Sequence, residues 1–444
     1  MERRFDRCRP LSWPLLLGLV AAVVLSYAPQ ARAQLVIEIT RSGVEAMPIA
    51  VVPFGWEGSG EAPLDLAALI SANLARTGLF DPMDRDDMVF LPTSGDEINF
   101  RDWRLLGSDV VVVGQVRPER DGLRIRFEVF DIVRGEQLLG YRTFATRGTL
   151  RATGHQISDM IYERLTGVPG AFNTRIAYVT VDGEAPNLRY RLVVADSDGE
   201  NEAVVLESRQ PIMSPAWSPD GRQLAYVSFE GGQSGVYVQT LRTGDRRQVS
   251  AREGINGAPV FSPDGRKLAL TLSRGRGNPD IYTLDIASQV LTRLTESASI
   301  DTEPDWSPDG QWVYFTSDRG GGPQVYRTSA DQPGRAQRIT YEGGYNARPR
   351  VSPDGESLAV VHLDRGNFRI AMVDIDSGNV RVLSGGRNDE SPSFAPNGAT
   401  LIYATREGGR GVLATVSSDG RVTQRLAVTQ GQVQEPAWSP SLSP

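Results

Sequence analysis

The stretch Pro215-Ala-Trp-Ser-Pro-Asp-Gly221 decides the fold, because variants of it recur through the C-terminal part of the chain. Successive copies lie 43 to 45 residues apart, a period typical of β-propeller blades built from four short strands. The copies begin at Pro215, Pro259, Pro304, Pro349, Pro392 and Pro436. Four copies carry the full Pro-Asp-Gly turn, the fifth has Asn397 in place of the aspartate, and the sixth is truncated at Trp438-Ser-Pro440. In the full turn, proline presets φ, the aspartate carboxylate accepts hydrogen bonds from nearby backbone, and glycine adopts the left-handed conformation that a hairpin needs.

Apolar strands follow five of these turns, as in Leu224-Ala-Tyr-Val227 and Trp312-Val-Tyr-Phe315. The segment Ile176-Ala-Tyr-Val179 has the same pattern without a turn motif before it, and the last motif, at Trp438, has no such strand after it. Counting both ends predicts six blades, with the C-terminal strand completing the blade that begins at Ile176. Such closure removes the exposed sheet edges of an open array.

The chain ahead of the repeats predicts a separate mixed α/β domain over residues 34–167. Its apolar and alternating runs predict strands over 49–54, 110–116, 124–130 and 136–144 and helices over 64–77 and 149–165. A Gly/Pro segment near Gly167 marks the boundary. The predicted fold class is therefore α+β, with this domain followed by a six-bladed all-β propeller over residues 168–444.

Residues 1–33 have the layout of a secretory signal peptide, with four early arginines, an apolar run from Leu15 to Leu25 and an Ala31-Arg32-Ala33 cleavage signature. The run is shorter than the ~20 residues of a membrane span, so we expect export without direct membrane insertion. Without these residues the formal charge of −7 becomes −10, which argues against nucleic acid and anionic lipid as partners. The single cysteine, Cys8, lies in the predicted signal, so the mature chain is predicted to have no disulfide.

The sequence offers no catalytic constellation. It has no Gly-x-Ser-x-Gly motif, and His155 and His362 are predicted to be ordinary surface or rim residues. The run Asp374 to Gly378 resembles the start of a calcium loop, but Gly385 stands where the closing glutamate would be, so we predict a turn. We therefore predict no enzymatic activity, no cofactor and no metal site.

Four motifs together resemble the TolB family of the Tol-Pal envelope system. They are Pro48-Ile-Ala-Val-Val-Pro-Phe54, Val111-Val-Val-Gly-Gln-Val116, Phe172-x-Thr-Arg-Ile-Ala-Tyr-Val179 and Met213-Ser-Pro-Ala-Trp-Ser-Pro-Asp-Gly221. The repeats alone indicate only a propeller, and the N-terminal motifs ahead of them make the resemblance specific. It implies a monomeric periplasmic adaptor that binds the Pal lipoprotein at the propeller mouth and TolA through an N-terminal tail. The family's role implies support of outer-membrane integrity and of constriction at cell division, with other envelope proteins as further partners.

The tail implied by this resemblance spans residues 34–47. Its head alternates apolar and polar residues, as expected of a strand that adds to a partner's sheet edge. The predicted TolA contacts are Gln34, Leu35, Val36, Ile37, Glu38, Ile39 and Thr40. Whether this segment instead pairs within its own domain in the unbound protein stays open.

The predicted Pal surface consists of the loops just ahead of the six turn motifs, at one rim of the central channel. The predicted contacts are Met213, Ser214, Ile255, Asn256, Gly257, Ala258, Asp301, Thr302, Glu303, Ala347, Arg348, Asp389, Glu390, Gln434 and Glu435. Acids dominate this rim, so a partner that presents basic or amide groups is expected. Ile255 departs from the family pattern, which often has histidine there.

A sugar-binding propeller is the alternative function. The aromatic residues ahead of the turns could each hold a glycan, and they are Trp217, Phe261, Trp306, Phe394 and Trp438. Their position favours packing between adjacent blades instead. The two functions differ in whether these side chains are exposed or buried.

Overall fold

The computed structural model of the 444-residue chain describes residues 46–273, 275, 277–426 and 431–442. The predicted signal peptide and the predicted TolA contacts, residues 34–40, lie outside the described residues.

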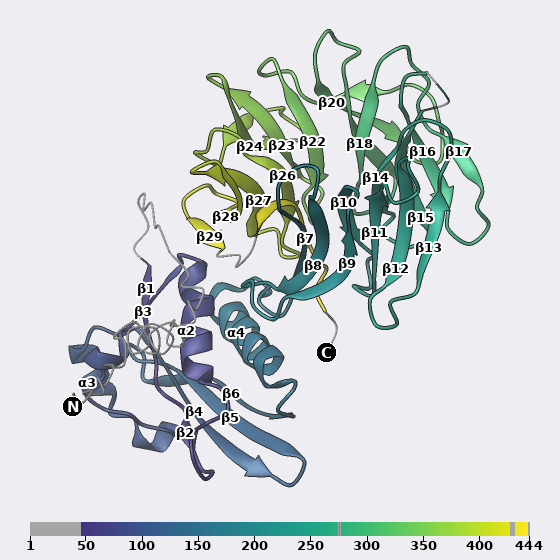
Figure 1. Cartoon of the computed structure of the whole chain (residues 1–444). Coiled ribbons are helices and arrows are strands. Elements are labelled where there is room, and N and C mark those ends of the chain that lie inside the picture. Colours follow the sequence, from purple (N-terminus) through teal and green to yellow (C-terminus); the bar gives the residue numbers. More distant parts are fainter. Residues whose placement is uncertain (1–45, 274, 276, 427–430, 443–444) are drawn as a thin grey trace, which may run out of the picture. The chain divides into compact units, whose positions relative to one another are not determined.

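An N-terminal sheet has the strand order β3-β1-β4-β5-β6, with β2 beside β4 (Figure 1). Strand β1 runs parallel to β3 and β4, whereas β4, β5 and β6 are antiparallel. The strands are β1 (Met47–Val51), β2 (Gly55–Trp56), β3 (Phe80–Pro82), β4 (Val110–Glu119), β5 (Gly122–Asp131) and β6 (Glu136–Ala145). The predicted strands are thus confirmed, and β2 and β3 are additional.

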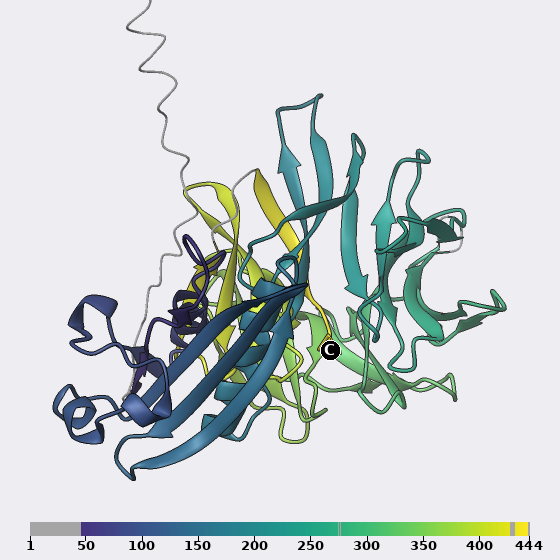
Figure 2. The same cartoon turned by 90° about the horizontal axis from the view of Figure 1, so that it is seen from below.

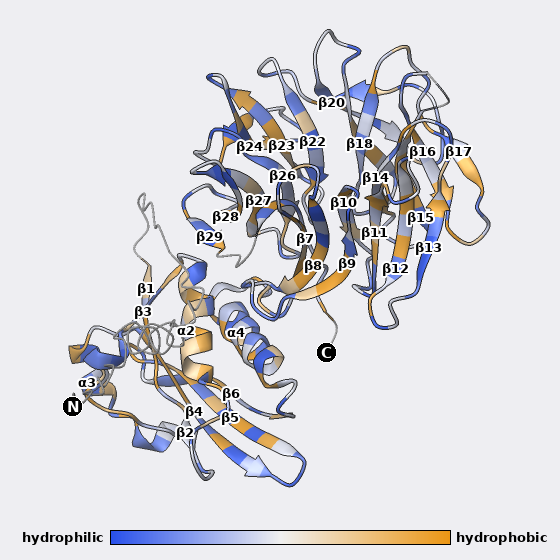
Figure 3. Ribbon diagram, in the orientation of Figure 1, coloured by the Kyte–Doolittle hydropathy of each residue, from blue (hydrophilic) through white to orange (hydrophobic). Residues whose placement is uncertain are grey.

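Helices α2 (Leu66–Arg76) and α4 (Leu150–Thr166) pack on one face of this sheet and share a core with β1, β4 and β5. Asp65 caps α2 by accepting a hydrogen bond from the Ala68 N–H at 3.0 Å, and α2 is largely apolar in Figure 3. The opposite face packs in part against α3 (Phe100–Leu105). Two short 3₁₀ helices (Arg85–Asp87 and Gly95–Glu97) precede α3 in the chain.

Six four-stranded antiparallel sheets follow, and Figures 1 and 2 show them as successive blades of a propeller. Each blade is named here by its innermost strand. The blades are β10 (Ile212–Trp217), β11 (Gln223–Ser228), β12 (Gly235–Thr240), β13 (Arg246–Ser250); β14 (Asn256–Phe261), β15 (Lys267–Leu272), β16 (Asp280–Asp285), β17 (Leu291–Arg293); β18 (Asp301–Trp306), β19 (Trp312–Ser317), β20 (Gln324–Ser329), β21 (Gln337–Arg338); β22 (Asn346–Val351), β23 (Ser357–Asp364), β24 (Asn367–Asp374), β25 (Val380–Val382); β26 (Glu390–Phe394), β27 (Thr400–Glu407), β28 (Arg410–Ser417), β29 (Thr423–Leu426); and β30 (Gln432–Trp438), β7 (Arg175–Asp182), β8 (Arg189–Asp196), β9 (Ala203–Ser208).

The ring closes as predicted, because the C-terminal strand β30 pairs with β7, the first strand of the propeller. Ser439 reinforces the closure: its Oγ accepts a hydrogen bond from the Arg175 N–H at 2.9 Å, and its own N–H donates to the Arg175 carbonyl. The six innermost strands contact one another in sequence around the ring, with β30 next to β10. The predicted six-bladed propeller is therefore confirmed.

The repeated turns have the predicted chemistry. In the β10 blade, Asp220 Oδ1 accepts hydrogen bonds from Ser218 Oγ and from the Arg222 N–H, and Gly221 has a φ of +67°. The aromatic residues ahead of the turns pack between blades: Trp217 Nε1 donates to the carbonyl of Ala437 in β30 at 3.0 Å. Trp217, Phe261 and Trp306 are buried, and Phe394 and Trp438 are half-buried.

Both histidines are buried, so the prediction that they are ordinary surface or rim residues is wrong. His155 Nδ1 lies 3.0 Å from Asn73 Nδ2 of α2, and His362 Nδ1 lies 2.9 Å from Asn346 Oδ1 of the innermost strand beside it. The helix and strand patterns did not reveal these polar partners, which are distant in sequence. Among the described residues, no helix is long and apolar enough to cross a membrane.

Candidate partner-binding rim of the propeller

Each innermost strand carries a β-bulge immediately before the proline that opens its turn motif. The residue directly ahead of each proline has a positive φ of 45° to 56°. These six residues are Ser214, Ala258, Glu303, Arg348, Ser391 and Glu435. A positive φ is uncommon for residues other than glycine, and bulges re-aim side chains beside binding sites. Because every blade repeats this bulge, the directions of six side chains are fixed at one end of the innermost strands.

The third position before each proline has a structural role. Its six residues are buried, and they are Ile212, Asn256, Asp301, Asn346, Asp389 and Val433. Asp301 accepts a hydrogen bond from Arg319 Nη2 at 2.6 Å, and Asp389 accepts one from Thr405 Oγ1 at 2.5 Å. Asn256, Asp301 and Asp389 are among the predicted partner contacts, and their buried side chains are hydrogen-bonded to neighbouring residues.

Arg348 bridges the ring. Its Nε donates to Glu303 Oε1 at 2.5 Å, its Nη2 donates to Glu435 Oε1 at 3.2 Å, and its Nη1 donates to Ser391 Oγ. The neighbouring carboxylates of Glu435 and Glu303 outweigh burial and raise the pKa of Arg348. The β18, β22, β26 and β30 blades are thus joined by one guanidinium group, which is a charge-assisted contact of the strong kind.

The remaining predicted contacts lie at the surface to different degrees. Met213 and Ile255 are 36% and 49% exposed, and Glu390 is also exposed. Ser214, Gly257, Ala258, Thr302, Glu303, Arg348, Gln434 and Glu435 are half-buried, and Ala347 is buried. Exposed side chains from the β10, β14 and β26 blades therefore accompany the bulges of the rim.

The rim has fewer unpaired carboxylates than its composition indicates. Glu303 and Glu435 are paired with Arg348, and Asp301 is paired with Arg319. Asp389 is buried among hydroxyl donors. Of the five predicted acids, only Glu390 is exposed and has no ion pair among the described residues.

The rim also carries an apolar arc that the sequence motifs did not predict. The fourth position before the proline is Ile255, Ile300 and Tyr345 in three successive blades. Ile300 is 47% exposed, similar to Ile255, and Tyr345 is half-buried. Aligning the repeats at their prolines is a signal that could have found Ile300 and Tyr345.

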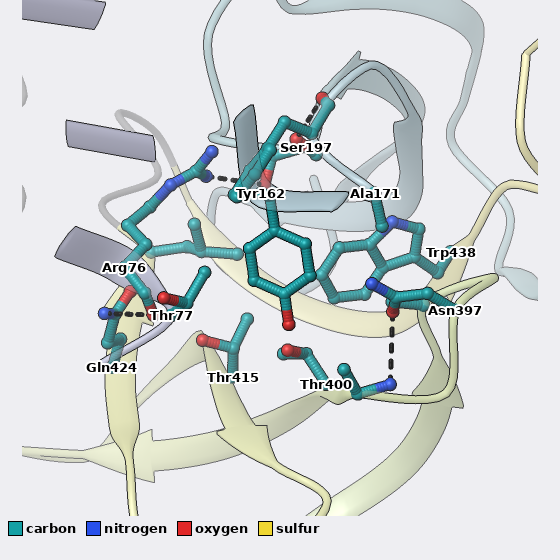
Figure 4. Close-up of a pocket in the computed structure, with 14 residues that line it drawn as sticks. Arg76, Thr77, Tyr162, Ala171, Ser197, Asn397, Thr400, Thr415, Gln424 and Trp438 are labelled. Carbon is teal, nitrogen blue, oxygen red and sulfur yellow. Dashed lines mark hydrogen bonds between the residues drawn. The ribbon is translucent and has the colours of Figure 1, made fainter. Parts of the chain in front are cut away.

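Away from the rim, a small cavity lies where α2 and α4 meet β28, β29 and the C-terminal strand. Tyr162, Arg76 and Trp438 line it, and Arg76 Nη1 donates to the Ser197 carbonyl at 3.3 Å (Figure 4). Its volume of about 50 Å³ leaves room for no more than a few water molecules. This cavity therefore lacks the size of a small-molecule site.

One group of described side chains has the composition of a metal site, namely His155, Asp196 and Asp198. Arg151 already pairs with both carboxylates, and burial lowers the pKa of His155 to about 4. A cation there would have to displace the guanidinium group. The calcium-like run at Asp374 forms a turn, as predicted, because Asp374 Oδ1 accepts from the Ser377 N–H at 2.7 Å.

Comparisons with known proteins point to the same family for the N-terminal domain and for the propeller. The model of the TolB beta propeller domain matches residues 162–442, and that of the TolB amino-terminal domain matches residues 35–138. The Tol-Pal system protein TolB of Thioalkalivibrio sulfidiphilus is 52% identical over 415 residues, which cover 93% of this chain and 95% of that protein. The corresponding protein of Nitrosococcus oceani is 51% identical over 96% of this chain and 99% of its own length. The crystal structure of TolB from Acinetobacter baumannii superposes with a TM-score of 0.84 at 41% identity and covers 92% of this chain and 100% of that one. The chain therefore belongs to the TolB family of the Tol-Pal system.

Proposed function

We propose that the protein is a non-enzymatic periplasmic adaptor of the Tol-Pal system, with the Pal lipoprotein bound at the propeller rim and TolA bound by the N-terminal tail. The geometry of the rim supports Pal binding. Six bulges fix its side chains in advance, so little conformational freedom is lost when a partner docks. The exposed Met213 and Ile255 supply apolar contact area, and the exposed Glu390 supplies a free charge.

Membership of the TolB family supports TolA binding by the N-terminal tail. The amino-terminal family match begins at residue 35, inside the predicted tail. The alternation of apolar and polar residues from Leu35 to Thr40 suits a strand that pairs with a partner's sheet edge. A role in outer-membrane integrity and in constriction at division follows from holding both partners.

The sugar-binding alternative requires exposed aromatic side chains. Trp217, Phe261 and Trp306 are buried between blades, and Phe394 and Trp438 are half-buried. No ring face in this set is fully open to a glycan. The observation favours the adaptor over the sugar-binding propeller.

The rim is tested by calorimetric titration of the mature chain, residues 34–444, with the soluble domain of Pal. We expect Ile255→Asp to weaken binding at least tenfold, because it places a charge in the apolar arc. Val204→Asp is the matched control, since Val204 is 58% exposed on the outermost strand β9. Equal losses in both variants, or no binding by the wild type, would refute the assignment of the rim.

The tail is tested separately, with the C-terminal domain of TolA as the probe. We expect a chain that starts at Met47 to lose TolA binding and to keep Pal binding. Retention of TolA binding by the shortened chain would place that site elsewhere.

A further inference from the structure

A recess of about 550 Å³ opens at the rim between the β22 and β26 blades. Tyr345 and Phe368 form one wall, and Arg348, Glu390 and Arg406 contribute charged groups. Tyr345, Phe368 and Arg406 were not among the predicted contacts. The recess is far larger than the cavity beside Tyr162 and can receive a whole side chain.

The aromatic wall is held rigidly. The rings of Tyr345 and Phe368 meet edge to face, with their centroids 5.1 Å apart. The Phe368 N–H donates to the Arg387 carbonyl at 3.0 Å, and the Phe368 carbonyl accepts from the Asp389 N–H at 2.9 Å. Phe368 remains 37% exposed, which leaves part of an aromatic surface in contact with water. Such a surface attracts a planar cation or another ring.

The charged groups that line the recess distinguish a cation from an aromatic ring as its occupant. Arg348 is saturated by Glu303, Glu435 and Ser391, and the Asp389 carboxylate is turned inward to Ser384 and Thr405. This leaves two groups of the recess without an ion pair among the described residues, the carboxylate of Glu390 and the guanidinium of Arg406.

The balance around the recess is negative. Three carboxylates, those of Glu303, Asp389 and Glu390, line it, against the guanidinium groups of Arg348 and Arg406. A free carboxylate beside an aromatic wall in such surroundings is the chemistry that binds a cation.

We propose that this recess receives one cationic side chain, an arginine or a lysine, from the protein that docks on the rim. In this arrangement Glu390 accepts hydrogen bonds from the cation, Phe368 and Tyr345 stack against it, and Arg406 opposes it. The location rests on the proposed function of the rim, whereas the preference for a cation rests on the recess itself.

The test uses calorimetric titration of the mature chain with the soluble domain of Pal and with Nα-acetyl-arginine amide. Glu390→Gln removes the charge at nearly constant volume and Phe368→Leu removes the aromatic ring while keeping an apolar side chain, and each is expected to weaken Pal binding by roughly tenfold. Arg406→Gln removes the opposing charge and is expected to tighten binding several-fold. Glu407→Gln is the matched control, because Glu407 lies next to Arg406 and pairs with Arg425 instead.

The outcomes separate the two proposals. If Pal binds but Glu390→Gln and Phe368→Leu match the control, the recess is not the anchor and this inference fails while the rim assignment stands. If Arg406→Gln weakens Pal binding, the occupant is anionic and the inference also fails. If the wild type binds the arginine derivative in a Glu390-dependent way and does not bind Pal, the recess is a cation site but Pal is not the partner of the rim. If neither probe binds, both proposals fail.

Discussion

At the residue scale, burial sets the protonation of His155. Asn73 Nδ2 can only donate, so the Nδ1 atom of His155 accepts and its Nε2 faces Asp198 Oδ2 at 3.5 Å. Burial lowers the pKa of His155 to about 4; the nearby Asp198 opposes this shift, and Arg76 and Arg151 add to it. The neutral imidazole is therefore the form that the folded protein prefers.

This preference predicts a specific loss of stability in acid. A histidine whose folded pKa lies below its unfolded value stabilises the protein above the unfolded pKa of ~6.5 and loses this contribution as the pH falls toward 4. Between pH 7.5 and pH 5 the loss amounts to about 2 kcal/mol of unfolding free energy. Urea unfolding at both pH values should show this extra loss in the wild type and not in His155→Gln. Equal pH dependence of the two proteins would contradict the argument.

Arg348 is the second residue whose removal should be costly. Arg348→Met leaves the carboxylates of Glu303 and Glu435 without their counter-ion, and both are mostly buried. We expect a loss of about 1–3 kcal/mol in unfolding free energy, because removing the cation leaves mostly buried carboxylates without a counter-charge. Chemical denaturation measures this loss.

The control for Arg348 is Arg365→Met, since Arg365 is 89% exposed and lies 3.8 Å from Asp364. Its loss should stay within about 0.5 kcal/mol. Adding Glu303→Gln to Arg348→Met should recover part of the stability. A double variant less stable than Arg348→Met alone would disprove the electrostatic explanation.

At the element scale, the bulge in each innermost strand holds a residue in a left-handed conformation that glycine adopts more easily. Ala258 has a φ of +45° and is half-buried. Ala258→Gly should therefore raise the unfolding free energy by roughly 0.5–1 kcal/mol, the net of relieved backbone strain and greater unfolded-state entropy. Thermal and urea unfolding provide the measurement.

Ala347 is the matched control for this substitution. It lies one residue ahead of the equivalent bulge of the β22 blade, in register with Val361, and it is buried and is not among the positive-φ residues. Ala347→Gly should lower stability by about 0.5–1 kcal/mol, opposite in sign to Ala258→Gly. Changes of the same sign in both variants would show that the left-handed geometry carries no strain.

The same elements show what the sequence could predict. The turn motif is local, so the Pro-Asp-Gly spacing was sufficient for the blade count and the closing strand. The burial of Asp301 and Asp389 was not predicted, because their partners Arg319 and Thr405 belong to other segments. The apolar Ile212 at the equivalent repeat position was the available signal that this position faces the interior. The short β2 and β3 lack a periodic pattern, and only the sheet around them stabilises them.

At the scale of the whole molecule, the ring is closed by contacts that converge on the C-terminal strand. Strand β30 completes the blade of β7, its Ala437 carbonyl accepts from Trp217, and Glu435 pairs with Arg348 across the ring. Glu435 Oε2 also accepts from the Ser214 N–H at 3.2 Å. One strand therefore contributes to the sheet, to the packing between blades and to the ionic bridge of the rim.

Because these contacts are lost together, a chain that ends at Leu426 should not form a closed propeller. The removal exposes the edge of β7 and takes away one of the two carboxylates that pair with Arg348, a cost comparable to the whole net stability of ~5–15 kcal/mol. We expect size-exclusion chromatography to show aggregation and circular dichroism to show no cooperative melting transition. A chain that ends at Pro440 keeps β30 and Ser439, so it should behave like the full chain. If the chain ending at Leu426 were monomeric with an unchanged melting temperature, the blades would be stable without closure, and the contacts of β30 would serve only the rim.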